Sequence, residues 1–131
     1  MFPNKETYIF AENSRKVTKK FEVKFLEEAK EFLDSLADKP REKIIYNIRK
    51  AQLTQDKELF KKLNDEIWEF RTLYNKTHYR LFAFWDKTDK IDTIVISTHG
   101  LIKKTDKTPP GDIIKAERLR NLYLKQKNQK L

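Results

Sequence analysis

Residues 67 to 99 constrain the fold more than any other segment, because they contain three apolar runs of strand length separated by short polar turns. These runs are Ile67–Tyr74, His78–Trp85 and Ile91–His99. Only a short loop around Asn75 and Lys76 separates the first two runs, a spacing typical of a β-hairpin. The third run contains the continuous apolar stretch 94–96, which is typical of a central strand covered on both faces. The segment therefore predicts three strands in an antiparallel meander.

Further regular elements are expected before and after this meander. Residues 21–25 alternate apolar and charged side chains, which predicts another half-buried strand. Apolar residues then recur at helical spacing, which predicts one helix over 26–36 and a second from Pro40 to Ala51, since proline suits the first turn of a helix. A last helix is expected to begin near Asp112. We interpret the chain as an α+β domain, with a small antiparallel sheet, an N-terminal helical hairpin and a C-terminal helix.

The rest of the chain divides into loops and ends. Residues 54–66 are polar and are expected to be irregular, and residues 101–110 are expected to form a loop. A chain of 131 residues has the length of a single domain. We place an N-terminal extension at residues 1–20, the domain at 21–124 and a basic tail at 125–131.

The chain carries a formal net charge of +9, and this excess lies near its two ends. Residues 1–20 contribute +3 and residues 103–131 contribute +6, whereas residues 21–102 carry equal numbers of acidic and basic side chains. Such an excess favours a polyanion as partner, because lysine and arginine release condensed counterions from phosphates. The alternative is that the lysine-rich ends only keep the protein soluble, and composition does not decide between the two.

Several functional classes are excluded or disfavoured by residue types that are absent. The chain has no cysteine, which excludes disulfides and thiolate metal sites. Its two histidines, His78 and His99, show no spacing to carboxylates that resembles a metal motif, so we expect neither a metal nor a cofactor. The first residues lack the pattern of a signal peptide, and no apolar stretch approaches the roughly 20 residues that span a membrane. We therefore expect a cytoplasmic protein without membrane contact.

Arg80 is unusual because it stands inside an aromatic strand. A period of two residues places it on the same face as Phe82 and Phe84. Burying an isolated charge there would be costly. Two interpretations stay open: Arg80 pairs across the strands with Glu69, or it forms a clamp for phosphate together with Arg71 on an open face of the sheet.

The segment from His99 to Pro109 places an imidazole at the end of an apolar strand and three lysines just after it. RNA cleavage by internal transesterification needs a proton removed from the 2′-hydroxyl, extra negative charge stabilised on the phosphorane, and a proton delivered to the 5′-oxygen. Lysine and arginine can stabilise that charge without a metal, and a histidine can transfer a proton. On residue type alone, however, His99 is more often a hydrogen-bonded residue at a strand end, and loop lysines are usually only solvated.

Residues 67–124 resemble the phage-derived HigB-like branch of the RelE/ParE toxin superfamily. The resemblance rests on IWEFR at residues 67–71, YRLFAF at 79–84 and HGLIKKTDKTP at 99–109, followed by a basic helix. The preceding strand and two helices also fit, so the likeness covers roughly residues 21–124.

This resemblance implies a metal-independent endoribonuclease that cuts mRNA in the ribosomal A site and so inhibits translation, together with a cognate helix-turn-helix antitoxin that neutralises it. The residues that it implies in catalysis are Arg71, Arg80, His99 and Lys104. Those that it implies in RNA binding are Lys103, Lys107 and Glu58. The best-supported match is Arg80, as a stabiliser of phosphate charge. RelE itself has lysines where Ile67 and Glu69 stand here, so the resemblance does not assign the general base.

Two other functional classes stay open at the level of sequence. A ParE-like inhibitor of DNA gyrase would share this fold, and fold does not fix function. A non-catalytic basic module would bind ribosomal RNA with a steep salt dependence and leave mRNA intact. The segment from His99 to Lys107 favours the nuclease over the gyrase inhibitor. The nuclease interpretation expects Arg80→Ala to abolish growth arrest and to leave the fold intact.

Overall fold

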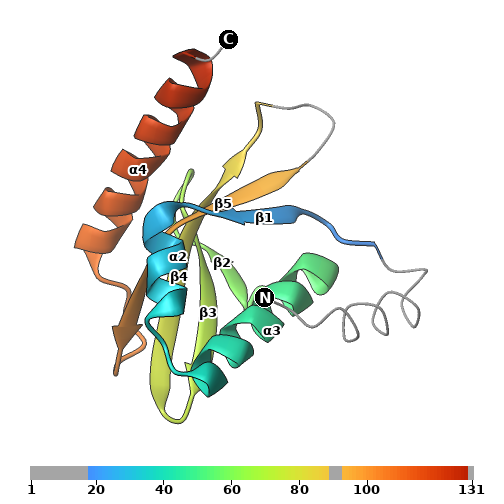
Figure 1. Ribbon diagram of the computed structural model, residues 1–131, viewed down its shortest axis with the longest axis vertical. Coiled ribbons are helices and arrows are strands. Elements are labelled where there is room, and N and C mark those ends of the chain that lie inside the picture. Colours follow the sequence, from blue (N-terminus) through green and yellow to red (C-terminus); the bar gives the residue numbers. More distant parts are fainter. Residues whose placement is uncertain (1–17, 89–92, 130–131) are drawn as a thin grey trace.

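The computed structural model describes residues 18–88 and 93–129, which form an α+β domain (Figure 1). In chain order the elements are β1 (Glu22–Phe25), α2 (Glu27–Asp34), α3 (Asp38–Thr54), β2 (Phe60–Lys62), β3 (Trp68–Tyr74), β4 (Thr77–Asp86), β5 (Ile94–Lys103) and α4 (Pro110–Gln129). The strands form one sheet in the order β1-β5-β4-β3-β2. This confirms the predicted fold class and both N-terminal helices. Residues 1–17, which make up most of the predicted extension, lie outside the described residues, as do 89–92 and 130–131.

The predicted hairpin is confirmed, and it sets the register of the central strands. Asn75 and Lys76 have φ angles of 52° and 64°. Positive φ at both loop residues is what a two-residue turn of this kind requires. β3 and β4 pair antiparallel from this turn, and the register places Arg71 directly opposite Arg80.

Two segments that were predicted to lack strands contain them. β5 continues to Lys103, where it pairs with His78, so residues 101–103 belong to a strand and not to a loop. The reason is that β4 is ten residues long and offers backbone partners along its whole length. β2 lies in the segment predicted to be irregular, and its three residues pair with β3 while Phe60 is buried in the core. In both cases the neighbouring strand supplies order that the local pattern does not encode.

The sheet departs from the antiparallel prediction at one edge, because β1 pairs with β5 in parallel. A parallel pair needs a long connection, and here α2, α3 and the β2–β4 strands lie between the two strands in the chain. α2 also packs closely on β5: a β-carbon at Gly100 would overlap the ring of Phe32, so this strand position has no room for a side chain.

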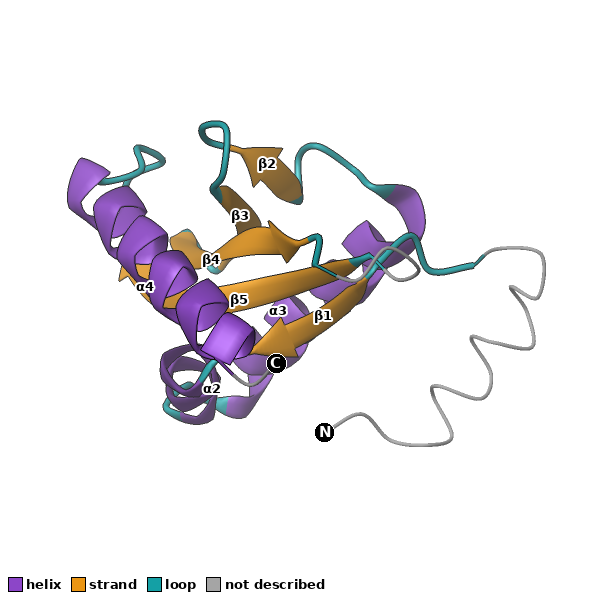
Figure 2. Cartoon of the chain, turned by 90° about the horizontal axis from the view of Figure 1, so that it is seen from above, coloured by secondary structure: helices purple, strands orange, loops and turns teal. Residues whose placement is uncertain are grey.

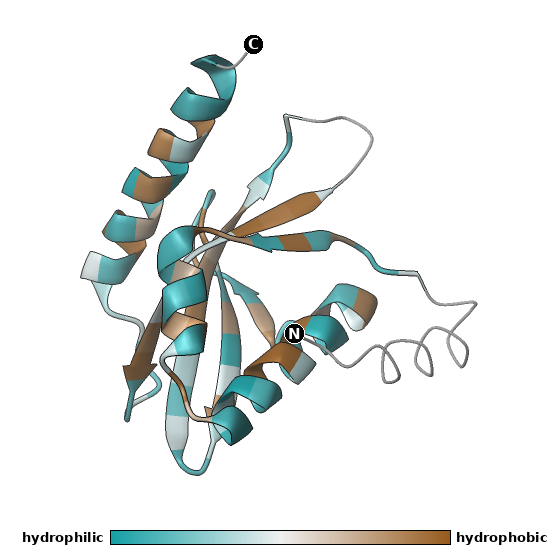
Figure 3. Ribbon diagram, viewed as in Figure 1, coloured by the Kyte–Doolittle hydropathy of each residue, from teal (hydrophilic) through white to brown (hydrophobic). Residues whose placement is uncertain are grey.

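Helices cover both faces of the sheet (Figure 2). On one face, residues of α2 and α3 such as Leu33 and Ile48 pack against the side chains of the central strands that include Leu81. On the other face, Ala116 of α4 packs against Phe82 and its neighbours. Figure 3 shows the apolar colour concentrated in the strands, with many hydrophilic residues on the helices. Fully burying one such side chain contributes about 1.5–3 kcal/mol, so these two layers fix the strands that carry the polar groups described below.

The buried carboxylate of Asp86, at the end of β4, binds the C-terminal half of α4. Oδ2 of Asp86 accepts hydrogen bonds from the Tyr123 hydroxyl at 2.7 Å and from Lys127 Nζ at 2.6 Å. Burial opposes ionisation of Asp86, but the hydrogen bonds from Lys127, Thr88 and Tyr123 hold its pKa well below the usual range. Burial and Asp86 together raise the pKa of Tyr123 to about 12. The predicted basic tail is therefore helical as far as Gln129. None of the described helices is both long and apolar enough to cross a membrane.

Candidate functional site

Polar side chains gather on the α4 face of the sheet, near the end of β5 and the start of α4. We call them the arginine cluster. Its members are Glu69 and Arg71 of β3, His78 and Arg80 of β4, Lys103 of β5, and Asp106 and Thr108 of the loop before α4. The register places the members from the three strands on one face, because paired residues and residues two apart share a face.

Arg80 lies at the base of this cluster and is only 1% exposed. Its Nη1 donates to Oε1 of Glu69 at 3.2 Å. Its Nη2 donates to Oδ1 of Asp106 at 2.5 Å and to the Asp106 carbonyl at 3.0 Å. The buried guanidinium is thus held between two carboxylates, one from the sheet and one from the loop.

Arg71 contacts the same two carboxylates from the neighbouring strand. Its Nη2 donates to Oδ1 of Asp106 at 2.5 Å, and its Nε lies 3.4 Å from Oε1 of Glu69. Two like charges directly opposite each other in a sheet are destabilising, and here the two carboxylates offset this repulsion. The two arginines therefore converge on a single oxygen atom, Oδ1 of Asp106.

The two carboxylates of the cluster differ in their surroundings. Glu69 is 1% exposed and also accepts hydrogen bonds from the Thr108 hydroxyl, at 3.1 Å to each oxygen. This confirms the Arg80–Glu69 cross-strand pair considered from the sequence. The Asp106 side chain is 71% exposed. Its pKa is held below the usual range by the hydrogen bond from Arg80 and by the charge of Arg71.

Lys103 adds a third cation with unusual surroundings. Among the described residues its Nζ is shielded from solvent and has no hydrogen-bond partner, and the same holds for Nε of Arg80. Burial lowers the pKa of Lys103, and the neighbouring charge of Arg80 acts in the same direction. A buried ammonium without an acceptor costs free energy. With Asp106 in place the three cations exceed the two carboxylates by one charge, so the cluster is suited to bind an anion.

His99, in contrast, is sealed inside the fold and is 3% exposed. Its Nδ1 lies 3.0 Å from the Thr98 hydroxyl, its Nε2 lies 3.1 Å from Oδ1 of Asp112, and its ring stacks on Phe82 with 4.8 Å between centroids. Both ring nitrogens are therefore occupied. His99 ties β5 to the first turn of α4, and the structure brings no free nitrogen of it to the arginine cluster.

We expect this histidine to make stability depend on pH. Burial lowers the pKa of His99, Lys115 acts in the same direction and Asp112 opposes them. A pKa that is lower in the folded than in the unfolded chain means that the stabilisation is complete above about pH 6.5 and is lost as the pH falls toward the folded value. The free energy of unfolding, measured with urea, should fall between about pH 7 and pH 5 in the wild type.

The matched variants are His99→Gln and His78→Gln. The pH-dependent loss should disappear in His99→Gln and persist in His78→Gln. An unchanged slope in His99→Gln would contradict this assignment.

The remaining predicted site residues lie outside the cluster. Lys104 and Lys107 are exposed on the loop before α4. Glu58 is exposed in the turn before β2, and within the described part of the chain no hydrogen bond or ion pair joins its carboxylate to the arginines. Of the residues implied by the resemblance, the structure thus brings together Arg71, Arg80 and Lys103.

The sequence interpretation did not include three members of the cluster: His78, Asp106 and Thr108. A signal for His78 was present, because it stands two residues before Arg80 and so shares its face. Asp106 and Thr108 lie within the segment already assigned to RNA binding, but no periodic pattern fixes where loop side chains point.

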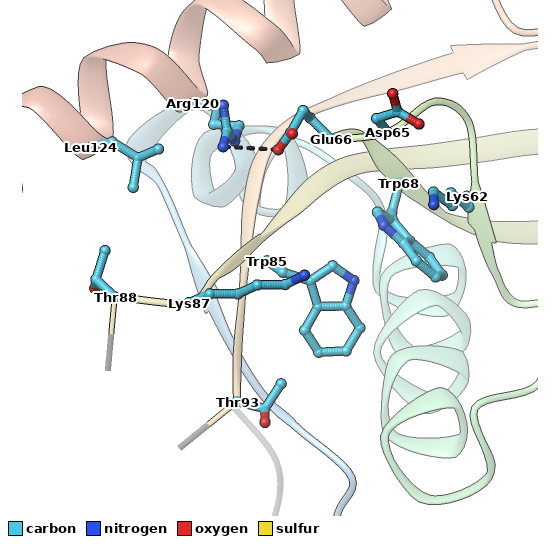
Figure 4. Close-up of a pocket in the computed structure, with 10 residues that line it drawn as sticks. All are labelled: Lys62, Asp65, Glu66, Trp68, Trp85, Lys87, Thr88, Thr93, Arg120 and Leu124. Atoms are coloured by element: carbon cyan, nitrogen blue, oxygen red, sulfur yellow. Dashed lines mark ion pairs between the residues drawn. The ribbon is translucent and has the colours of Figure 1, made fainter. Parts of the chain in front are cut away.

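A second polar surface lies elsewhere, in a groove of about 740 Å³ (Figure 4). It is lined by Trp68 and Trp85, whose rings meet edge to face with 5.8 Å between centroids, and by charged residues of both signs. Arg120 forms an ion pair with Glu66 at 2.8 Å. Because its charges are mixed and partly paired, this groove does not concentrate positive charge as the arginine cluster does.

Residues 31–121 match the model of a family described as "Phage derived protein Gp49-like (DUF891)". The match includes every strand residue of the arginine cluster and the loop before α4. The chain matches no curated protein.

Proposed function

The chain belongs to the Gp49-like phage-derived proteins, a family of toxin-like proteins, and we propose that it inhibits translation by cutting mRNA on the ribosome. One observation carries the proposal. Arg71 and Arg80 both donate to one carboxylate oxygen, on a loop that is largely exposed to solvent. An oxygen that accepts from two guanidinium groups has the surroundings of a phosphate oxygen.

In this proposal a phosphate of the RNA takes the position of the Asp106 carboxylate. Asp106 is the carboxylate that a phosphate can displace, because it stands on a loop and is largely exposed, whereas Glu69 is buried. Arg80 is already fixed by Glu69, so it meets the phosphate without loss of side-chain freedom. Such preorganised cations stabilise charge that develops in a transition state.

In this proposal Lys103 is the third cation that contacts the phosphate. Its buried Nζ has no acceptor among the described residues, and a phosphate in the cluster would supply one. The reaction that fits these groups is internal transesterification: the 2′-oxygen attacks phosphorus and the 5′-oxygen leaves. It needs stabilised negative charge and two proton transfers.

A toxin of this kind is kept inactive by a cognate antitoxin. We propose a helix-turn-helix protein for this role, as the resemblance of the sequence implies. A small neighbouring gene with that motif, whose product restores growth after induction of this chain, supports the pair. An induced chain that arrests no growth would argue against a toxin.

The test of the proposed activity is to map mRNA 5′ ends after brief induction. We expect new ends inside translated codons, appearing within minutes and before growth stops. DNA damage without new RNA ends would favour the gyrase inhibitor. Binding to ribosomes without new ends would favour the non-catalytic module, and either result would overturn the nuclease.

A further inference from the structure

RNA cleavage at the arginine cluster needs a group that can accept a proton. The arginines cannot be this proton acceptor. A guanidinium stays protonated in proteins. His99 has both ring nitrogens engaged inside the fold. The imidazole that does lie at the cluster is that of His78.

His78 is placed by the strand register. It is the second residue of β4, opposite Lys103 on one side and Leu73 on the other, and it shares the face of Arg80. Its side chain is 21% exposed, so solvent and substrate can reach the ring. Its Nδ1 lies 3.9 Å from Oδ1 of Asp106, the same oxygen on which Arg71 and Arg80 converge.

We propose that His78 is the catalytic base of this site. The inference rests on the proposed nuclease function. If a phosphate oxygen takes the place of Oδ1 of Asp106, the 2′-hydroxyl of the ribose that carries this phosphate lies close to the same point, where the imidazole can reach it. A base must lie within hydrogen-bond distance of the proton that it accepts, directly or through one water.

Neutral His78 accepts the proton of the 2′-hydroxyl while the bond between the 2′-oxygen and phosphorus forms. The bond between phosphorus and the 5′-oxygen breaks, and this oxygen takes a proton from the Lys103 ammonium. The products are a 2′,3′-cyclic phosphate and a 5′-hydroxyl, and solvent returns both residues to their starting protonation states.

The charges around His78 come from every element packed beside it. They are Lys103 of β5, Arg80 of its own strand, Arg71 and Glu69 of β3, and Asp106 of the loop. Burial and Arg80 both lower the pKa of Lys103, which makes its ammonium a better proton donor than an ordinary lysine. Asp106 is the one group here that leaves when the substrate binds.

The test is a single-turnover cleavage assay with purified full-length protein and programmed ribosomes. For the wild type we expect the rate to rise with pH, because only the neutral imidazole can accept the proton of the 2′-hydroxyl. His78→Gln should reduce the rate about 10²- to 10⁴-fold and abolish that rise, with little change in the concentration of ribosomes needed for half-saturation. Added imidazole should restore part of the rate to His78→Ala.

The matched control is Tyr46→Gln, which changes an exposed ring on α3, on the opposite face of the sheet. It should behave as the wild type, and circular dichroism should show that all variants are folded. His78→Asn is the second variant if His78→Gln does not fold. A folded His78 variant with the wild-type rate and pH profile would overturn this inference alone, whereas a wild type that makes no cuts would overturn the proposed nuclease as well.

Discussion

Arg71→Gln is expected to slow RNA cleavage about 100- to 1,000-fold and to leave the fold intact. That range is the usual cost of removing one preorganised donor from a developing negative charge. The fold should survive because Arg71 is 19% exposed and because Arg80 still holds Asp106 and Glu69. Arg71→Lys should keep only part of the activity, since lysine cannot present the planar fork of donors. The measurement is the single-turnover rate on programmed ribosomes.

The control for this prediction is Arg118→Gln, which removes the same charge from an exposed position on α4. If charge acted only by attracting RNA at long range, the two variants would lose activity equally. Equal losses, or no loss in Arg71→Gln, would contradict the role of the arginine cluster in the chemical step.

Arg80→Gln, in contrast, is expected to destabilise the protein by about 3–5 kcal/mol. Removing one partner of a buried ion pair leaves the other charge uncompensated, and Glu69 is only 1% exposed. Glu69 would keep only the Thr108 hydroxyl and the more distant Arg71 Nε. The sequence-based expectation that Arg80→Ala leaves the fold intact therefore needs revision, and loss of toxicity in that variant would not by itself identify a catalytic role.

Urea unfolding tests the predicted loss of stability. The free energy of unfolding is measured for Arg80→Gln, for Glu69→Gln and for the double variant Glu69→Gln/Arg80→Gln. The double variant should be more stable than Arg80→Gln, because neither buried charge remains and the two neutral side-chain amides can form a hydrogen bond with each other. A loss below about 1 kcal/mol in Arg80→Gln would mean that the pair is solvated. Strictly additive losses would mean that the two side chains do not interact.

The sequence predicted those elements whose pattern is local. The hairpin at Asn75 and Lys76 was found because only a short loop separates two runs of strand length, and the helices because apolar residues recur on one face. The pairing of the strands could not be predicted, because a period of two shows which face of a strand is buried and not which strand lies beside it. The parallel pairing of β1 with β5 and the three-residue β2 are both of this kind.

The candidate site was predicted in part for the same reason. Strand periodicity placed Glu69, Arg71 and Arg80 near one another, and the register confirms this. The contribution of Asp106 depends on the path of the loop before α4, which no periodic pattern encodes. His99 was expected at the site because the resemblance of the sequence implies it in catalysis, but its ring turns toward α4, where Asp112 accepts from it.

Asp106 gives the most direct test of the central claim, that a substrate phosphate binds where this carboxylate lies. The measurement is the dissociation constant for ribosomes programmed with an mRNA whose A-site codon carries 2′-deoxyribose, so that it cannot be cut. Asp106→Asn should bind several-fold more tightly than the wild type, because the phosphate no longer has to displace a carboxylate from Arg71 and the buried Arg80. Glu31→Gln, which removes an equal charge from an exposed site on α2, should bind as the wild type does. Equal affinities for Asp106→Asn and Glu31→Gln, or weaker binding by Asp106→Asn, would contradict the claim.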